Sequence, residues 1–182
     1  MIMYDIESLD VESTSVILSL AAVYFDPDEI VSYNELLDRA LFVKFDVTEQ
    51  ITKYKRTISQ STAEWWRKQA EIPQVTSLIP SKDDVSAEQG LSLMSNYYKG
   101  NGKGIVWARG ALDQLATESL YRKIGRDPFC MFNMWRDVRT AVDLLYDTST
   151  GYRNIDGFDP SHSVIKHHPV HDCAYDILML KS

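Results

Sequence analysis

The chain has 182 residues, of which 45% are hydrophobic and 25% are charged. This length and composition are typical of one globular domain, spanning residues 1–182, and exclude a disordered or fibrous chain. The longest apolar run, residues 16–25, is about half of what a membrane span requires, so no membrane partner is expected. Residues 1–7 lack a basic segment and already contain Asp5, which argues against a signal peptide and favours the cytoplasm.

Charge and cysteine content narrow the function classes further. The two cysteines, Cys130 and Cys173, are too few for a disulfide framework, which fits a reducing compartment. The formal net charge of −7 excludes a histone-like basic binder. It does not exclude a nuclease, because a site that holds divalent cations must itself be acidic.

Hydrophobic patterning predicts three strands in the first quarter of the chain, at residues 2–7, 16–25 and 41–45. The second strand is apolar throughout and is expected to be buried on both faces. Ser61 and Glu64 have the spacing of a capping box, which predicts a helix that begins there and ends at Pro73.

The rest of the chain predicts helices that alternate with short strands. Strands are expected at residues 105–107 and 132–136, and helices at 85–99, 111–124, 138–145 and 172–180. Asp137 is expected to cap the third of these helices. Residues 147–170 indicate a long loop. This order predicts an α/β fold with a mixed five-stranded sheet that starts antiparallel and continues through helical crossovers.

Several carboxylates occur where apolar side chains are expected. Asp5 and Glu7 lie two apart on the first strand, so both side chains point to one face. They are either strand-end charges in solvent or a pair that holds a cation. Asp113 opens a helix, where a carboxylate is also favoured by the helix dipole alone.

The last predicted helix carries a further acid on its apolar stripe. Asp176 shares this stripe with Cys173 and Ile177. A buried carboxylate needs a partner, which is either an arginine, a helix terminus or a metal ion. His171, at the beginning of this helix, is expected to reach the same site.

Together these acids and the histidine form the pattern of the DEDD exonucleases in their histidine-containing branch (DEDDh), which have a ribonuclease-H-like fold. The chain resembles the RNase T-like 3′→5′ exonucleases, in particular the exonuclease A type of large tailed bacteriophages. The resemblance covers essentially the whole chain and rests on residues 61–69, 107–110, 135–140 and 171–179. Relatives often carry an aromatic residue where this chain has Leu112.

The resemblance implies a two-metal-ion phosphodiesterase. Its metal ligands, for two Mg²⁺ or Mn²⁺ ions, are expected to be Asp5, Glu7, Asp113 and Asp176, and His171 is expected to accept the proton of the attacking water. The implied substrate is the 3′ end of single-stranded DNA, degraded to 5′-mononucleotides. If a phage encodes the chain, the host cytoplasm is the expected location. The oligomeric state stays open.

Substrate contacts are expected from four further residues. The resemblance places Ser8 and Leu9 at the terminal sugar and base. Trp65 and Trp66 are adjacent and therefore point in different directions, so one is expected in the core and one, taken as Trp66, at a base. Arg109 is expected either to hold a phosphate or to pair with a carboxylate. His162, His167 and His168 are expected to be solvated, with contact to the nucleic acid as the alternative.

Three other functions compete with this prediction. An exoribonuclease of the same family differs only in its contacts to the 2′-hydroxyl group. A catalytically silent module that binds nucleic-acid ends predicts the loss of at least one of the five site residues. A ribonuclease-H-like endonuclease is disfavoured because the first two acids lie so close on one strand.

Overall fold

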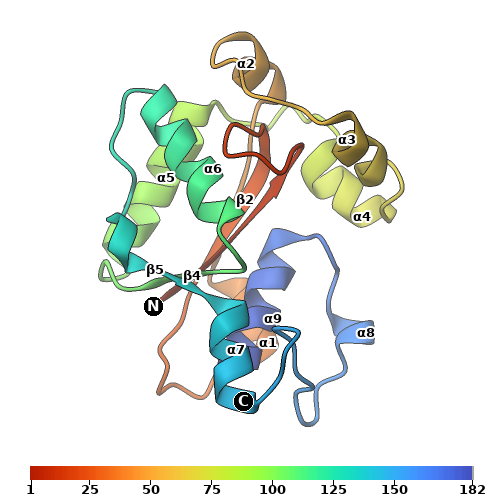
Figure 1. Cartoon of the computed structure of the whole chain (residues 1–182), viewed down its shortest axis with the longest axis vertical. Helices are drawn as coiled ribbons and strands as arrows, with labels where there is room; N and C mark the ends of the chain where they lie inside the picture. The colour runs from red at the N-terminus through yellow and green to blue at the C-terminus, as the bar shows by residue number, and fades with distance from the viewer. Residues whose placement is uncertain (182) are drawn as a thin grey trace.

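The computed structural model describes residues 1–181 and shows an α/β fold built on one mixed five-stranded sheet with the order β3-β2-β1-β4-β5 (Figure 1). The strands are β1 (Ile2–Ser8), β2 (Ile17–Tyr24), β3 (Ala40–Lys44), β4 (Val106–Ala108) and β5 (Trp135–Asp137). The first three strands are antiparallel neighbours, and β4 and β5 add in parallel beside β1. The predicted ribonuclease-H-like architecture is thereby confirmed.

Helices cover both faces of this sheet. Along the chain they are α1 (Tyr33–Asp38), α2 (Val47–Thr52), α3 (Gln60–Trp66), α4 (Glu71–Pro73), α5 (Ala87–Gly100), α6 (Leu112–Lys123), α7 (Val138–Tyr146), α8 (Pro160–Ser163) and α9 (Pro169–Lys181). A π-helical turn follows α4 at Gln74–Leu78, and a 3₁₀ turn precedes β5 at Phe132–Met134. Among residues 1–181, no helix combines the length and apolarity that a membrane crossing needs.

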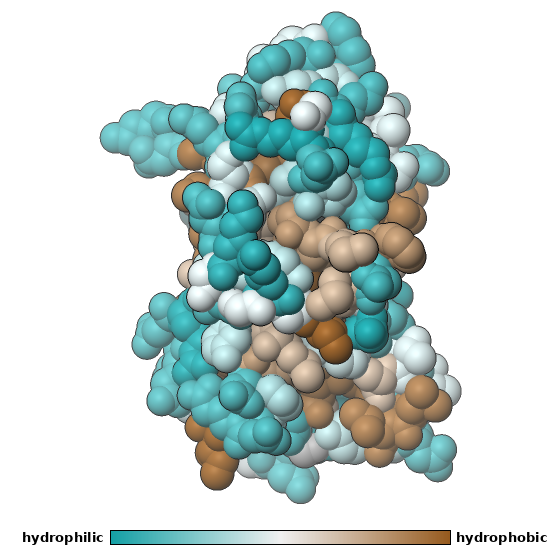
Figure 2. Space-filling model, turned by 90° about the vertical axis from the view of Figure 1, so that its left-hand side faces the viewer, coloured by the Kyte–Doolittle hydropathy of each residue, from teal (hydrophilic) through white to brown (hydrophobic). Residues whose placement is uncertain are grey.

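The two sides of the sheet have separate cores. Tyr4 and Ile6 of β1 pack with residues of α5 and α6 on one side. Met3 of β1 packs with residues of α1, α7 and α9 on the other, so these three helices lie together in Figure 1. Strand β2 is almost wholly buried, as its apolar sequence predicted. Figure 2 shows the face that carries α5 and α6, where a hydrophobic patch in the middle is flanked by hydrophilic side chains and further hydrophobic groups lie near the lower end.

Local capping chemistry corrects part of the predicted helix at residues 61–73. Helix α3 is capped by Ser59, whose hydroxyl accepts a hydrogen bond from the Thr62 amide, rather than by Ser61. It ends at Trp66, before Pro73, because Trp66 is anchored in a small core and the next amides form tighter turns. By contrast, Asp137 caps α7 as predicted and accepts a hydrogen bond from the Thr140 amide.

Other differences concern short elements. The predicted strand 132–136 starts only at Trp135. The helix expected to begin at residue 172 begins at Pro169, one turn earlier. Helices α1 and α2 were not predicted, since six residues carry too little periodicity to be recognised.

Candidate active site

The carboxylates of β1 lie at the end of the central strand, on the face covered by α9. Because side chains alternate along a strand, Asp5 and Glu7 share the α9 side with Met3, while Tyr4 and Ile6 face the opposite core. The pairing of β1 with β2 is irregular between Glu7 and Ser8, as is common beside active sites. The loop after the parallel strand β4 meets this same edge, where α/β sheets bind their ligands.

Asp113 reaches the same place from the first turn of α6. It is only 6% exposed, and its Oδ1 accepts a hydrogen bond of 3.0 Å from the Ile6 amide of β1. Burial raises the pKa of Asp113 to about 7. Burial also raises the pKa of Asp5 and Glu7 well above the usual range, and the neighbouring carboxylates raise it further.

Two acids of α9, Asp172 and Asp176, face this group of carboxylates. They are four residues apart and therefore lie on the same side of the helix. Burial, with the charge of Asp176 as a second cause, raises the pKa of Asp172 to about 7. The negative charge of Asp172 in turn raises the pKa of both Asp5 and Glu7. Asp172 was not among the predicted site residues.

Asp176 has a cationic partner. Arg109, in the loop after β4, donates from Nε to both carboxylate oxygens at 3.1 Å and from Nη2 to Oδ1 at 2.6 Å. The same guanidinium donates to the Gly151 carbonyl at 2.8 Å and lies over the Tyr152 ring at 4.1 Å. Of the two partners that the sequence left open for Arg109, the structure thus shows the carboxylate.

His167 lies beside the acids. Its ring nitrogen and carboxylate oxygens of Glu7 and Asp172 all lie within 4.8 Å of one another, a spacing that suits a metal ion or shared protons. Its backbone amide also donates a hydrogen bond to Asp172. The ring packs edge-to-face on Trp65 with centroids 4.8 Å apart. Burial lowers the pKa of His167, which keeps the imidazole neutral at neutral pH.

His171 points to a different neighbourhood. Its Nδ1 forms a hydrogen bond of 2.7 Å with the Tyr33 hydroxyl. Its ring packs edge-to-face on the ring of His168, with centroids 4.7 Å apart. Because α9 begins at Pro169, His171 is already within the helix, where it packs toward α1.

The structure brings Asp176 to the expected site, since its charge raises the pKa of both Asp5 and Asp113, and pairs it there with Arg109, while His171 is bonded to Tyr33. The sequence contains two overlapping patterns with the same spacing, His167-x4-Asp172 and His171-x4-Asp176. Both residues of the first pattern lie beside Glu7, whereas His171 and Asp176 of the second pattern are bonded to Tyr33 and Arg109. The expectation that His167 and His168 are solvated is wrong, since both rings are partly buried against aromatic side chains. His162 is exposed, as predicted.

A groove of about 400 Å³ adjoins Glu7 and runs between β1 and α3. Ser8 lines this groove and donates its hydroxyl to the Asp10 carbonyl. Leu9 and Trp66 are 5% and 1% exposed and pack in a small core, with the Trp66 indole donating to the Ser8 carbonyl. Trp65 is 41% exposed and also lines the groove. The structure thus favours Trp65 over Trp66 and Leu9 for contact with a ligand.

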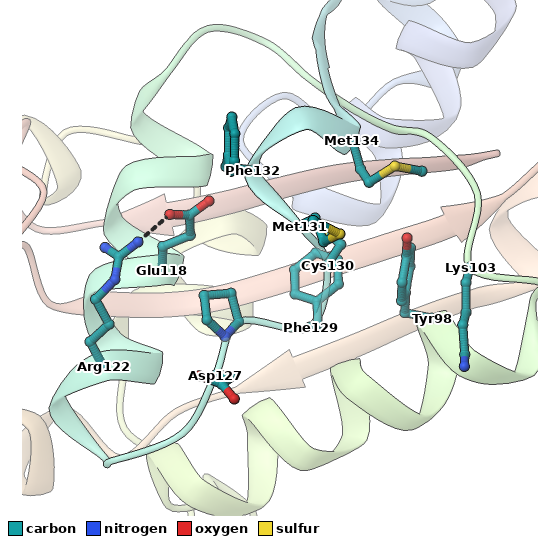
Figure 3. A pocket seen from close by; sticks show the side chains of 11 residues that line it. Tyr98, Lys103, Glu118, Arg122, Asp127, Phe129, Cys130, Met131, Phe132 and Met134 are labelled. Atoms are coloured by element: carbon teal, nitrogen blue, oxygen red, sulfur yellow. Dashed lines mark hydrogen bonds and ion pairs between the residues drawn. The ribbon is translucent and has the colours of Figure 1, made fainter.

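A larger hollow of about 570 Å³ lies on the far side of α6 and contains none of the predicted site residues (Figure 3). Aromatic and sulfur-containing side chains, among them Phe129 and Met134, form its walls. Glu118 and Arg122 at its edge are paired with each other at 2.6 Å. This hollow lacks the converging acids that hydrolysis of a phosphodiester needs.

The sheet order and the carboxylates gathered at the end of β1 define a nuclease of the ribonuclease-H-like class. Comparison with known families gives the particular one: residues 1–181 match the model of the 3′-5′ exoribonuclease Rv2179c-like domain, and the chain belongs to this family of 3′–5′ exonucleases. The chain is also similar to a protein named exodeoxyribonuclease from Enterobacteria phage T4. The two are 32% identical over 203 residues, which cover 97% of this chain and 86% of the relative.

Proposed function

We propose that the chain is a metal-dependent exonuclease that removes 5′-mononucleotides from the 3′ end of single-stranded DNA. The observation that carries this proposal is the group Asp5, Glu7, Asp113 and Asp172. None of the four forms an ion pair with a lysine or arginine in the part of the chain that is described. Burial raises the pKa of each, so the group stores repulsion that a bound cation would relieve.

These side chains fit Mg²⁺ or Mn²⁺, because hard divalent cations prefer carboxylate oxygens. We assign Asp5, Glu7, Asp113 and Asp172 as the residues that would hold two such ions. When bound, the ions would activate a water molecule and stabilise the leaving 3′ oxygen. Asp176 also lies near Asp5 and Asp113, but it is paired with Arg109 at 2.6 Å, and for this reason we assign Asp172 in preference to it.

His167 is the residue we assign to proton transfer. It lies beside Glu7 and Asp172, and its lowered pKa keeps one ring nitrogen free to accept a proton at neutral pH. The hydrogen bond from its own amide to Asp172 holds the histidine and the carboxylate together. His171, whose Nδ1 contacts the Tyr33 hydroxyl and accepts from the Ile165 amide at 3.4 Å, would instead hold the loop before α9 in place.

The groove between β1 and α3 would hold the 3′-terminal nucleotide. Its volume of about 400 Å³ suits one nucleotide, with Ser8 at the sugar and Trp65 positioned to stack on the base. A base pair would have to be opened before the terminal nucleotide could enter, at a cost of a few kcal/mol. This favours single strands over duplexes.

The choice of DNA rests on the phage T4 relative, which is named an exodeoxyribonuclease. RNA is the second candidate, because the matching family model is described as an exoribonuclease. A catalytically silent module is disfavoured, since the carboxylates are all present and gathered at one place.

The test uses 5′-labelled DNA and RNA 20-mers of matched sequence, each single-stranded and as a blunt duplex, with free or blocked 3′ ends. We expect ladders that shorten from the 3′ end in Mg²⁺ or Mn²⁺ and no cleavage in EDTA. Equal shortening of 3′-blocked strands would contradict the polarity, and faster cleavage of RNA would contradict the DNA assignment. A lack of any metal-dependent cleavage would contradict the assignment of the chain as an active nuclease.

A further inference from the structure

A second hollow, of about 450 Å³, lies on the other side of the α6 start from the groove at Glu7. Leu112 lines the groove, while Gln114 lines the second hollow. Two residues along a helix turn the side chain by about 200°, so the two openings flank Asp113 from opposite sides. A chain that passes over Asp113 would therefore run from one opening to the other.

Arg139, near the start of α7, brings an uncompensated positive charge to this hollow. Among residues 1–181 no carboxylate oxygen lies within ion-pair distance of its guanidinium, and its side chain is exposed. It lies over Gly110, where a Cβ atom would come within 3.6 Å of its Nη1. Its charge reaches the active site, because it offsets part of the rise in pKa that burial causes at Asp113.

The position of Arg139 is fixed by its surroundings. Asp137 accepts hydrogen bonds of 2.9 Å from the Gly110 and Thr140 amides, which ties the start of α7 to the loop after β4. The stem of Arg139 lies so close to Gly151 that an added Cβ there would be 2.6 Å from its Cγ. The stem of Arg139 is thus held in place, and its guanidinium lies beside Gly110 at the edge of the hollow.

Trp135 provides a flat wall in the same hollow. Two aromatic rings, Tyr4 at 5.5 Å and Phe129 at 5.6 Å, contact the indole edge-to-face and fix its plane. Its side chain is half-buried and lines the hollow, and its Nε1 has no hydrogen-bond partner among the described residues. Arg136 adds a second cation, which donates to the Asn133 and Trp135 carbonyls and to no carboxylate of residues 1–181.

Resting on the proposed exonuclease function, we propose that this hollow binds the nucleotide on the 5′ side of the scissile phosphate. Arg139 contacts the backbone phosphate of that nucleotide, and Trp135 provides a stacking surface for its base. A protein of net charge −7 that holds a polyanion needs cations at the path of the backbone, and Arg139 and Arg136 supply them here. Stacking on an indole does not depend on base identity, so this subsite distinguishes substrates by the presence of a second nucleotide and not by its base.

The test compares substrates with and without this nucleotide. In the p-nitrophenyl ester of thymidine 5′-monophosphate, p-nitrophenol takes the place of the 5′ nucleotide as leaving group, so the second hollow stays empty. 5′-Phosphorylated thymidine oligonucleotides of two, three and ten nucleotides fill it and carry the phosphate that Arg139 would contact. For Arg139→Gln we expect the ratio of kcat/KM on oligonucleotides to kcat/KM on the ester to fall about 10- to 100-fold, as for the loss of one charge-assisted phosphate contact. Arg139→Lys should recover part of this ratio.

Arg122→Gln is the matched control, because it removes the same charge from α6 at the larger hollow of Figure 3. Its ratio should equal that of the wild type. An equal fall on ester and oligonucleotides in Arg139→Gln would show that Arg139 acts through the carboxylates, and an unaltered ratio would show that the hollow is not used; either result overturns the proposal. Failure of the proposed function looks different, since the wild type would then hydrolyse neither substrate.

Discussion

Replacing Asp172 by asparagine tests which of the two overlapping His-x4-Asp patterns forms the active site, because the change is expected to lower activity and to raise stability. The pKa of Asp172 rises from 3.8 to about 7 in the fold, which corresponds to about 4 kcal/mol against the ionised form above neutral pH. Burial is the larger cause of this rise and the charge of Asp176 is the second, and a buried amide needs new hydrogen bonds. We therefore expect Asp172→Asn to raise the free energy of unfolding of the metal-free protein by about 1–3 kcal/mol at pH 8.

The sign of this effect depends on pH in a defined way. A carboxyl group whose pKa is raised by folding stabilises the protein when protonated and loses that contribution as pH rises from 3.8 to about 7. The gain from Asp172→Asn should thus be close to zero near pH 4 and complete above about pH 7. At about 2–4 °C per kcal/mol for a chain of this size, the expected rise in Tm at pH 8 is about 2–12 °C.

Asp176→Asn is the matched control on the same face of α9. It leaves Arg109, whose side chain is 13% exposed, without its anionic partner. Breaking a buried ion pair from one side is costly, so we expect a loss of about 2–4 kcal/mol. Activity should follow the reverse order, with Asp172→Asn at least about 10³-fold slower and Asp176→Asn within about tenfold of the wild type at a temperature where it is folded.

The assay is thermal unfolding in EDTA at pH 4, 6 and 8, paired with cleavage of a labelled DNA 20-mer in Mn²⁺. A stabilised but active Asp172→Asn protein would remove Asp172 from the ligand set. A stabilised and inactive Asp176→Asn protein would restore Asp176 and refute the assignment of Arg109 as its partner.

Three further predictions follow from the same geometry. His167→Asn should slow cleavage about 10²–10⁴-fold, while His171→Asn should stay within about fivefold of the wild type. The wild-type rate should fall at acidic pH below 6.5, where His167 becomes protonated. Equal losses in both variants would contradict the assignment of the base. Added Mg²⁺ should raise Tm more at pH 8 than at pH 5, because protons compete with the cation for the carboxylates, and a larger rise at pH 5 would place the cation elsewhere. Trp65→Ala should raise KM about 5- to 100-fold with little change in Tm, whereas Trp66→Ala should destabilise the fold by about 3–5 kcal/mol; the opposite pattern would return the substrate contact to Trp66.

The strands and long helices were predictable because their residues carry strong periodic or continuous apolar patterns. The run that forms β2 is buried on both faces, as its composition requires. Helix α5 begins at Ala87, two residues after the predicted start, at a capping box formed by Ser86 and Gln89. In α3, Ser59 and Ser61 are both suitable caps by residue type, and the structure shows Ser59 in this role, with Trp66 buried at the end of the helix.

Within the site, the sequence pointed to the acids of β1 and α6 and to Asp176 on α9, but not to Asp172, whose charge acts on the same carboxylates. Asp172 and Asp176 are four residues apart, so any argument from the apolar face of the helix accepts both. The structure distinguishes them through Arg109, which is 67 residues from Asp176 along the chain. A contact of this kind depends on the path of the loop after β4, which local patterns do not encode.

The position of bound metal tests the central claim most directly. A crystal of the protein soaked with Mn²⁺ and thymidine 5′-monophosphate would show the ions by their anomalous scattering. We predict two peaks about 3.5–4 Å apart, contacted by Asp5, Glu7, Asp113 and Asp172, with Asp176 still paired with Arg109. Peaks bound by Asp176 in place of Asp172, or no peak at the end of β1, would contradict the account.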